Sequence, residues 1–215
     1  MSRLILVRHA QSEANRDGVS LGRADSPLTE LGLRQAAALG EALAGAPLER
    51  VLASPLRRAR DTARAIATHH GLEVETHDDL TEMAIGELEG LPWAELRERY
   101  ADFLREWLAE DAVSLKMPGG ESLADVDRRA WPVIAPIFAQ DGDGTIVVVS
   151  HNWVIRVLIC RALDVDVKRW RQFEVDLASR SVFDCRESGV VMRSLNDACH
   201  LTPDLVAPAP NSQRR

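Results

Sequence analysis

The stretch Leu4-Ile5-Leu6-Val7-Arg8-His9 is a run of four apolar residues that ends abruptly in an arginine and a histidine. Such a continuous apolar run is typical of a strand buried on both faces within a parallel sheet. Thr145–Val149 repeats the pattern with β-branched residues and ends in Ser150-His151. Because ligands of an open parallel sheet bind outside the carboxyl ends of its strands, both histidines are expected at one functional edge.

Strand-like runs and helix-like stretches alternate along the rest of the chain. Glu49–Ala53 predicts a shorter strand, and Val182–Cys185 with Val190–Leu195 predicts a closing hairpin around residues 187–189. The expected helices run from residues 26–29 to about residue 44, over 56–69, over 93–108, from 121–122 onward, and over 152–163. This alternation predicts an α/β fold, a three-layer α/β/α sandwich around a mixed, mainly parallel sheet.

Several residues mark the expected helix ends. Ser54 and Pro55 are typical of an N-cap and a first helical position, and Gly71 supplies a stop. Pro132 and Pro136 lie inside the stretch that follows residue 122, so they are expected to kink or divide that helix.

The bulk composition predicts one domain. A chain of 215 residues that is 46% hydrophobic can bury one substantial core, which we place over residues 1–201. Residues 202–215 contain three prolines and no apolar periodicity, and they are expected to form a disordered tail.

Charge and cysteine usage restrict the partners. The net charge of -7 has no basic block, which argues against nucleic acid or an anionic membrane as a partner. The apolar run at residues 4–7 is too short for a signal or a membrane span, so a cytoplasmic protein is expected. Cys160, Cys185 and Cys199 include no CxxC pair, and they are expected to be packing residues rather than disulfides or metal ligands.

The polar residues at the strand ends indicate phosphate chemistry. A lone histidine after a strand is more often structural, but here there are two, and Arg8 beside His9 offers a planar fork that matches phosphate. Arg58 lies in a second cationic segment at a helix start, which alone would be interpreted as a solvated turn. Phosphoryl transfer needs such cations, an in-line nucleophile and a proton donor. A neutral imidazole can be the nucleophile and form a phosphohistidine that water then cleaves.

Seven ordered segments strengthen this interpretation. They are residues 4–15 (LILVRHAQSEAN), 26–32 (SPLTELG), 53–59 (ASPLRRA), 80–82 (LTE), 86–90 (GELEG), 118–122 (PGGES) and 149–151 (VSH). Together they resemble the signature of the histidine phosphatase superfamily, which includes the cofactor-dependent phosphoglycerate mutases. The resemblance covers nearly the whole chain up to about Leu201, and it implies the phosphoglycerate mutase-like fold.

The resemblance assigns a role to each site residue. It implies that His9 accepts the phosphoryl group and that Glu82 is first the acid and later the base. Arg8, Arg58 and His151 would bind the phosphoryl oxygens.

The same resemblance extends to the rim of the pocket. Gln11 and Asn15 would complete it, and the backbone N–H of Asn152 would replace a donor that the family usually takes from a glycine. Ala10 replaces a more frequent glycine, and Trp153 replaces a small residue, which affects the shape of the pocket and the choice of substrate. Trp93, Trp107 and Trp153 are expected in the core or at its rim rather than in the pocket.

Alternative functions make different predictions. Mutase members carry a longer insertion after the acidic residue, and residues 87–118 are too short for it, so a phosphatase is favoured. A zinc site built from His9, His151 and Glu82 is disfavoured by the adjacent arginines and by the lack of HxxxH or HExxH spacing. A phosphate-binding module without catalysis is disfavoured because His9 and Glu82 are both present.

The resemblance implies neither an organic cofactor nor a metal. The expected partner is a small phosphorylated metabolite, with phosphoserine, 3-phosphoglycerate, sugar phosphates and α-ribazole phosphate as candidates. Residues 195–201 resemble the C-terminal end of phosphoserine-phosphatase-like members. A homodimer follows from family analogy alone.

Overall fold

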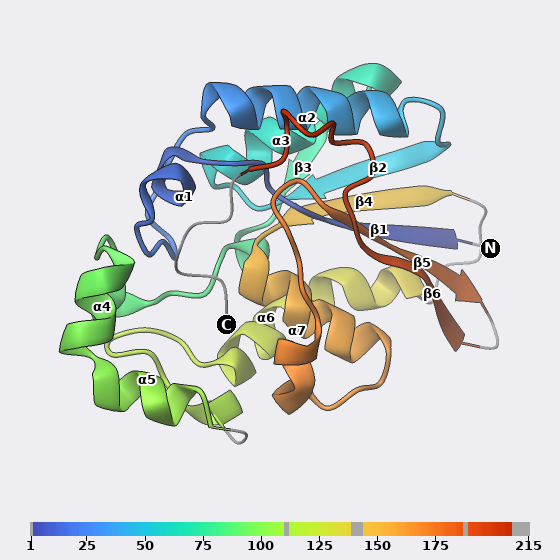
Figure 1. Cartoon of the computed structure of the whole chain (residues 1–215). Helices are drawn as coiled ribbons and strands as arrows, with labels where there is room; N and C mark the ends of the chain where they lie inside the picture. Colours follow the sequence, from blue (N-terminus) through green and yellow to red (C-terminus); the bar gives the residue numbers. More distant parts are fainter. Residues whose placement is uncertain (1, 110–111, 139–143, 187–188, 208–215) are drawn as a thin grey trace.

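A six-stranded mixed sheet forms the centre of the molecule (Figure 1). The computed structural model describes the chain except for residues 1, 110–111, 139–143, 187–188 and 208–215. The strand order is β3-β2-β4-β1-β5-β6, and the strands are β1 (Ser2–Arg8), β2 (Leu48–Ala53), β3 (Val74–Thr76), β4 (Thr145–Ser150), β5 (Arg180–Arg186) and β6 (Gly189–Asp197). β1, β2, β3 and β4 run parallel, whereas β5 and β6 pair antiparallel as the expected hairpin. The mixed, mainly parallel sheet is confirmed.

Helices cover both faces of this sheet, which confirms the three-layer architecture (Figure 1). The helices are α1 (Glu13–Asp17), α2 (Glu30–Leu43), α3 (Arg57–Ala67), α4 (Trp93–Arg99), α5 (Ala101–Trp107), α6 (Leu123–Phe138) and α7 (Asn152–Ala162). Short 3-10 turns lie at Thr68–His70, Asp78–Leu80, Gly86–Leu88, Ala112–Ser114 and Val167–Gln172.

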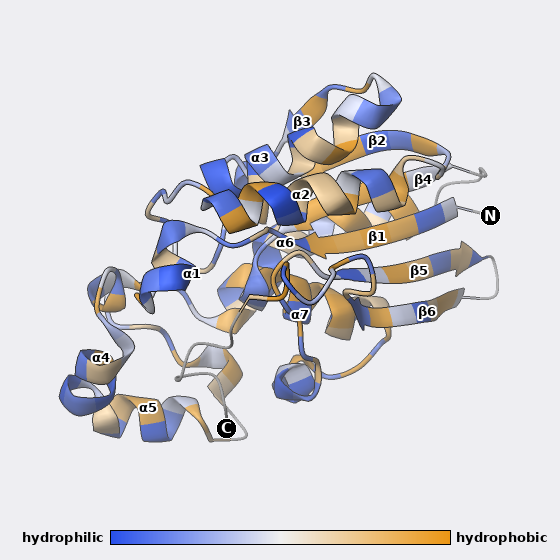
Figure 2. Cartoon of the chain, turned by 45° about the horizontal axis from the view of Figure 1, so that its top comes forward, coloured by the Kyte–Doolittle hydropathy of each residue, from blue (hydrophilic) through white to orange (hydrophobic). Residues whose placement is uncertain are grey.

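The two faces of β1 supply two cores. Ile5 and Val7 pack with α2 and α3, whereas Leu4 and Leu6 pack with α6 and α7. This is the consequence of a strand whose successive side chains alternate between faces and are all apolar. Figure 2 shows the resulting hydrophobic ribbon of β1 between the helical layers.

Two local expectations are corrected, and a third is narrowed. α3 begins at Arg57, not directly after Ser54-Pro55, and the residue at its N-cap is Leu56, whose side chain has no polar atom to cap the helix; the Ser54 hydroxyl accepts from the N–H of Leu56 at 3.3 Å instead. The stretch 93–108 is two helices, because the backbone of Tyr100 leaves helical geometry. Pro132 and Pro136 lie inside α6 and do not divide it, so of the two expected effects only a kink stays a prediction.

The segment between β3 and α6 leaves the three layers. α4 and α5 stand away from the sheet beside the carboxyl ends of β1 and β4 (Figure 1). Trp107 at the end of α5 is buried, and its ring lies 5.9 Å from that of Trp170. This excursion therefore forms a wall next to the edge at which ligands are expected.

The segment after residue 201, which the sequence predicts to be one disordered tail, begins with residues that contact α2. Residues 202–207 are described, and the Gln35 amide donates to the Leu205 carbonyl at 2.8 Å while Arg34 pairs with Asp204 at 3.3 Å. Because these contacts with α2 are polar, the apolar periodicity of the sequence could not predict them. The rest of the expected tail, 208–215, lies outside the described residues, as does the hairpin turn at 187–188.

The cysteines are free thiols, two of them buried and Cys199 exposed, so Cys199 is not the packing residue that was expected. Within the described ranges, no helix has both the length and the apolar content needed to cross a membrane.

Candidate active site

Two histidines meet at the carboxyl edge of the sheet, as predicted. His9 directly follows β1 and His151 directly follows β4, and the N–H of His9 donates to the Ser150 carbonyl at 3.0 Å. Their ring centroids are 5.0 Å apart. The parallel pairing of β1 with β4 thus brings together residues that are 142 positions apart in sequence (151 minus 9).

His9 is held as a neutral imidazole with one free nitrogen. Its Nδ1 lies 2.8 Å from the carbonyl of Ala10, and a carbonyl only accepts, so Nδ1 carries the proton and Nε2 keeps its lone pair. Burial, followed by the charges of Arg58 and Arg8, lowers the pKa of His9 well below its usual value. The ring is therefore neutral over the physiological pH range, and the lone pair of Nε2 is available.

His151 is equally buried and has one unsatisfied nitrogen. Its Nε2 bonds the Ser54 hydroxyl at 2.8 Å, whereas its Nδ1 has no partner among the described residues. Burial lowers the pKa of His151 well below its usual value, with Arg58 the next cause. A buried ring nitrogen without a hydrogen-bond partner costs stability unless a ligand supplies one.

Two buried guanidinium groups flank the histidines. Arg8 donates to the Val175 carbonyl at 2.7 Å, and Arg58 donates to the carbonyls of Gly22 and Ala24 at 2.7 and 2.9 Å. Neither forms a salt bridge within the described part of the chain, and the Nε of each is buried without a partner. Burial lowers the pKa of Arg8 to about 10 and that of Arg58 in the same direction. Cations left unpaired in this way form a site for an anion.

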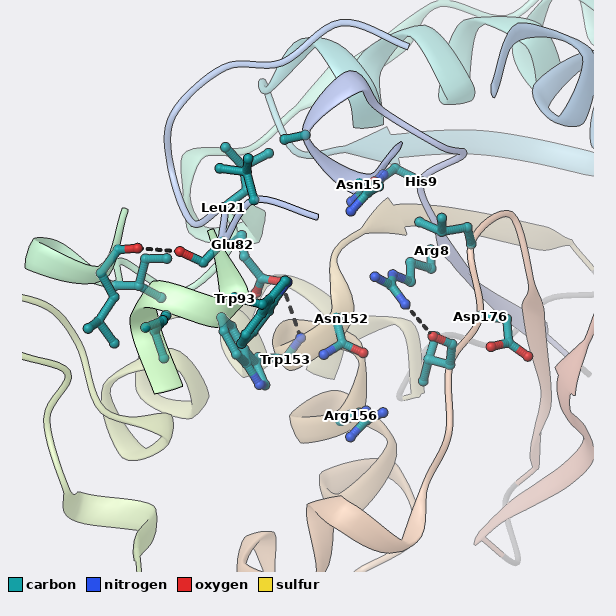
Figure 3. Close-up of a pocket in the computed structure, with 18 of the residues that line it drawn as sticks. Arg8, His9, Asn15, Leu21, Glu82, Trp93, Asn152, Trp153, Arg156 and Asp176 are labelled. Carbon is teal, nitrogen blue, oxygen red and sulfur yellow. Dashed lines mark hydrogen bonds between the residues drawn. The ribbon is translucent and has the colours of Figure 1, made fainter. Parts of the chain in front are cut away.

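Glu82 supplies a buried carboxyl group opposite these cations. Its Oε1 accepts from the N–H of Met83 at 2.9 Å, and its Oε2 accepts from the N–H of Trp153 at 3.3 Å (Figure 3). Burial raises the pKa of Glu82 and outweighs the opposing effect of these bonds and of Arg58. The carboxyl group can therefore hold a proton at a higher pH than an exposed glutamate.

The motif around residues 118–122 positions the loop that carries Glu82. Glu121 accepts from the N–H of Ala84 at 2.9 Å and pairs with Arg129 at 3.0 Å, and Arg129 also donates to the Glu82 carbonyl at 3.2 Å. A Cβ at Gly120 would lie 2.2 Å from the Ala84 carbonyl oxygen, so only glycine fits there. This contact explains physically why the sequence places a glycine before Glu121.

Gln11 and Asn15 both line the pocket with donor groups. The Oδ1 of Asn15 accepts from the N–H and the hydroxyl of Ser12 at 3.1 and 2.9 Å, and the Oε1 of Gln11 accepts from the Thr29 hydroxyl at 2.8 Å. With their oxygens engaged, both amides present NH₂ groups to the pocket. Asn152 also lines the pocket as the first residue of α7, where free backbone N–H groups favour anions.

The pocket has a volume of about 880 Å³ and extends well beyond the phosphate-sized polar end. Trp93 and Trp153 lie side by side next to Glu82 (Figure 3), and Trp107 and Trp170 line the same cavity. Trp107 belongs to the buried core, and Trp93 and Trp153 pack partly buried against it, as expected. All three also line the cavity, which was not expected.

Four polar residues of this site were not predicted from the sequence. Ser54 was assigned to a helix cap, and Arg156, Glu174 and Asp176 were not singled out, although all three line the pocket. Arg156 follows Asn152 by four residues, so helical spacing could have placed both on one face. No comparable signal marks Glu174 and Asp176, which lie in an irregular segment.

The fold and this site together define an α/β enzyme that acts on phosphate monoesters. The profile of the histidine phosphatase superfamily (branch 1) matches residues 4–198. Phosphoserine phosphatase 1 of Hydrogenobacter thermophilus is 37% identical over 201 residues, which cover 94% of this chain and 95% of that protein. Adenosylcobalamin/alpha-ribazole phosphatase of Salmonella typhimurium is 34% identical over 208 residues, with 94% and 100% covered.

Solved structures agree with these relatives. A mycobacterial glucosyl-3-phosphoglycerate phosphatase superposes with a TM-score of 0.80 at 28% identity, over 90% of this chain and 98% of that one. A mutant phosphoserine phosphatase from Entamoeba histolytica in complex with phosphoserine gives 0.78 at 29% identity, over 94% and 100%. The chain belongs to the histidine phosphatase superfamily, with the phosphoglycerate mutase-like fold. It is a hydrolase of phosphoric monoesters.

Proposed function

We propose that hydrolysis proceeds through a phosphohistidine on His9. The Nε2 of His9 attacks phosphorus in line with the ester oxygen, the P–O bond to the alcohol breaks, and protonated Glu82 gives its proton to the departing oxygen. Water then attacks the phosphohistidine while Glu82 takes up a proton, which releases phosphate and restores the imidazole. Arg8 and Arg58 neutralise the oxygens of the transferred group, and the neutral ring of His151 donates a hydrogen bond to them.

A single observation carries this proposal. His9 has its Nδ1 fixed on the Ala10 carbonyl and its pKa depressed beside two arginines that form no salt bridge within the described residues. A structural histidine would need no unpaired cations around it. Gln11, Asn15 and the N–H of Asn152 add neutral donors to the same anion site.

The substrate is proposed to be a small phosphorylated metabolite, with phosphoserine the first candidate. The support is the 37% identity to a protein named phosphoserine phosphatase 1. α-Ribazole phosphate is a second candidate because the pocket is lined by four tryptophans that could hold a flat aromatic group, namely Trp93, Trp107, Trp153 and Trp170. A homodimer and a cytoplasmic location stay predictions.

The proposal is tested by phosphate release from a panel of phosphate monoesters with a chelator present and His9→Ala as the blank. A phosphorylated intermediate that accumulates in the first turnover and is absent in His9→Ala would support the mechanism. One substrate standing roughly a hundredfold above the others, about 2.7 kcal/mol in transition-state binding, would indicate a dedicated metabolic role.

Three outcomes would contradict it. Conversion of 3-phosphoglycerate to 2-phosphoglycerate faster than release of phosphate would identify a mutase. Activity lost with the chelator and restored by zinc would identify a metal hydrolase. A folded preparation that binds phosphate and turns over nothing would identify a binding module.

A further inference from the structure

Arg156 is a further cation that lines the pocket, in addition to Arg8 and Arg58 at its polar end. It projects from α7 one helical turn after Asn152, and both residues line the cavity (Figure 3). Its guanidinium carbon lies 5.4 Å from the centre of the Trp170 ring, which limits the orientations of the group.

Arg156 has no direct ion-pair partner among the described residues. Its side chain also makes no hydrogen bond within them, and its Nε is buried without a partner. Burial is the main cause that lowers its pKa. Arg161 on the same helix shows the usual arrangement, since it lies over Trp131 and pairs with Asp127 at 3.4 Å. A partly desolvated cation without a counter-ion is stabilised by an anionic ligand.

Two carboxylates line the same part of the pocket. Glu174 and Asp176 act electrostatically on Arg156 but form no salt bridge with it. Asp176 is fixed by Asn196, whose amide donates to its Oδ2 at 2.8 Å and accepts from its N–H at 2.6 Å. The Oδ1 of Asp176 has no partner among the described residues, so it stays available to a ligand.

From this juxtaposition we infer that Arg156, Glu174 and Asp176 form a subsite for the zwitterionic end of an O-phosphorylated amino acid. The guanidinium binds the α-carboxylate through paired N–H groups, and the two carboxylates bind the α-ammonium. A second phosphate would be repelled by Glu174 and Asp176, and a simple carboxylic acid would leave them without a partner. The inference rests on the proposed function, because the phosphoryl end must occupy the site of His9.

Four substrates separate the two charges: O-phosphoserine carries both, phosphoethanolamine only the ammonium, 2-carboxyethyl phosphate only the carboxylate, and ethyl phosphate neither. A hydrogen bond to a charged group contributes about 1.5–3 kcal/mol, roughly 10- to 100-fold in kcat/KM. Arg156→Gln is expected to lower the ratio of phosphoserine to phosphoethanolamine by about 30-fold. The double variant Glu174→Gln/Asp176→Asn is expected to lower the ratio of phosphoserine to 2-carboxyethyl phosphate by about 10-fold.

Arg161→Gln is the matched control, since it removes an arginine from the same helix and from another tryptophan face, and neither ratio should change. Equal losses on all four substrates in Arg156→Gln would overturn the subsite, because Arg156 would then act on the phosphoryl group. Phosphoserine binding to His9→Ala, with and without Arg156→Gln, is measured by calorimetry. Weaker binding in the double variant His9→Ala/Arg156→Gln would support the subsite, and equal binding would overturn it, whether or not turnover is found. Absence of His9-dependent turnover is a separate outcome that would refute the proposed function.

Discussion

Glu82 needs both a raised pKa, so that it can hold a proton, and hydrogen bonds that fix its orientation but lower that pKa. Burial raises its pKa, while the N–H groups of Met83 and Trp153 hold its two oxygens. Because a general acid must be protonated, a raised pKa extends its working range to higher pH. Activity on alkyl phosphates is therefore expected to fall as the pH rises through the pKa of Glu82.

Glu82→Gln tests this role by the dependence on the leaving group. Its first turnover should be slower by about 10²- to 10⁴-fold for ethyl phosphate, whose alkoxide needs a proton, and much less for p-nitrophenyl phosphate. The fall in rate at high pH should disappear in the variant. An equal loss on both substrates, with the pH profile unchanged, would mean that Glu82 only maintains the pocket.

Ser54 is expected to set the tautomer of His151. If the Ser54 hydroxyl donates to Nε2 at 2.8 Å, the proton of His151 resides on Nδ1, which is buried and has no partner among the described residues. This N–H can then donate a hydrogen bond to a phosphoryl oxygen. Ser54→Ala should lower kcat/KM by about tenfold, the equivalent of one hydrogen bond.

The control for Ser54 is Ser2→Ala, which removes another buried hydroxyl, one that donates to the Ile137 carbonyl at 3.3 Å at the end of β1 remote from His9. Nitrogen NMR should show a neutral ring protonated on Nδ1 in the native protein and a mixture in Ser54→Ala. Protonation on Nε2 in the native protein would refute the assignment.

At the scale of elements, α2 fixes the N-terminal side of the pocket through a close backbone contact. A Cβ at Gly32, in the first turn of α2, would lie 2.0 Å from the carbonyl oxygen of Gln11. Gly32→Ala should therefore reduce the free energy of unfolding by about 1–3 kcal/mol, as overpacking does, and lower kcat/KM by displacing Gln11.

Gly45→Ala is the matched comparison, because nothing lies within 4 Å of a Cβ there. It is expected to leave stability unchanged or to raise it by up to about 1 kcal/mol. Urea denaturation measures both variants, and equal stability of the two would show that the loop at Gln11 yields without cost.

The elements that the sequence predicted well are those with strong local patterns. The apolar runs of β1 and β4 and the alternation with helices were sufficient for the layers and for the meeting of His9 with His151. The division of 93–108 at Tyr100 was missed because that segment has helical periodicity throughout and contains neither glycine nor proline.

The site was predictable only as far as motifs reach. The matched segments contain Arg8, His9, Arg58, Glu82 and His151. The positions of the pocket tryptophans and of Glu174 and Asp176 depend instead on how α4, α5 and an irregular segment fold over the sheet edge. Long-range placement of this kind leaves no periodic signal in one sequence.

At the scale of the whole molecule, the buried pair Arg8 and Arg58 is a source of instability that a bound anion should remove. Arg8 and Arg58 are buried without salt bridges in the described residues, inside a protein of net charge -7 that otherwise repels anions. A ligand that binds only the folded state stabilises it by about 2.7 kcal/mol at a hundred times its Kd. Inorganic phosphate is therefore expected to raise the thermal midpoint by roughly 5–10 °C for a chain of this length.

The shift itself, rather than the absolute midpoint, is the quantity to compare. Chloride at matched ionic strength should raise the thermal midpoint only slightly, because a spherical monovalent ion cannot accept from the paired N–H groups of two guanidinium groups. Arg58→Gln, which has lost one of those groups, should show a much smaller shift with phosphate even if it starts from a lower midpoint. A shift as large in chloride, or undiminished in Arg58→Gln, would place the stabilising anion elsewhere on the molecule and would leave the buried arginines without a ligand to explain them.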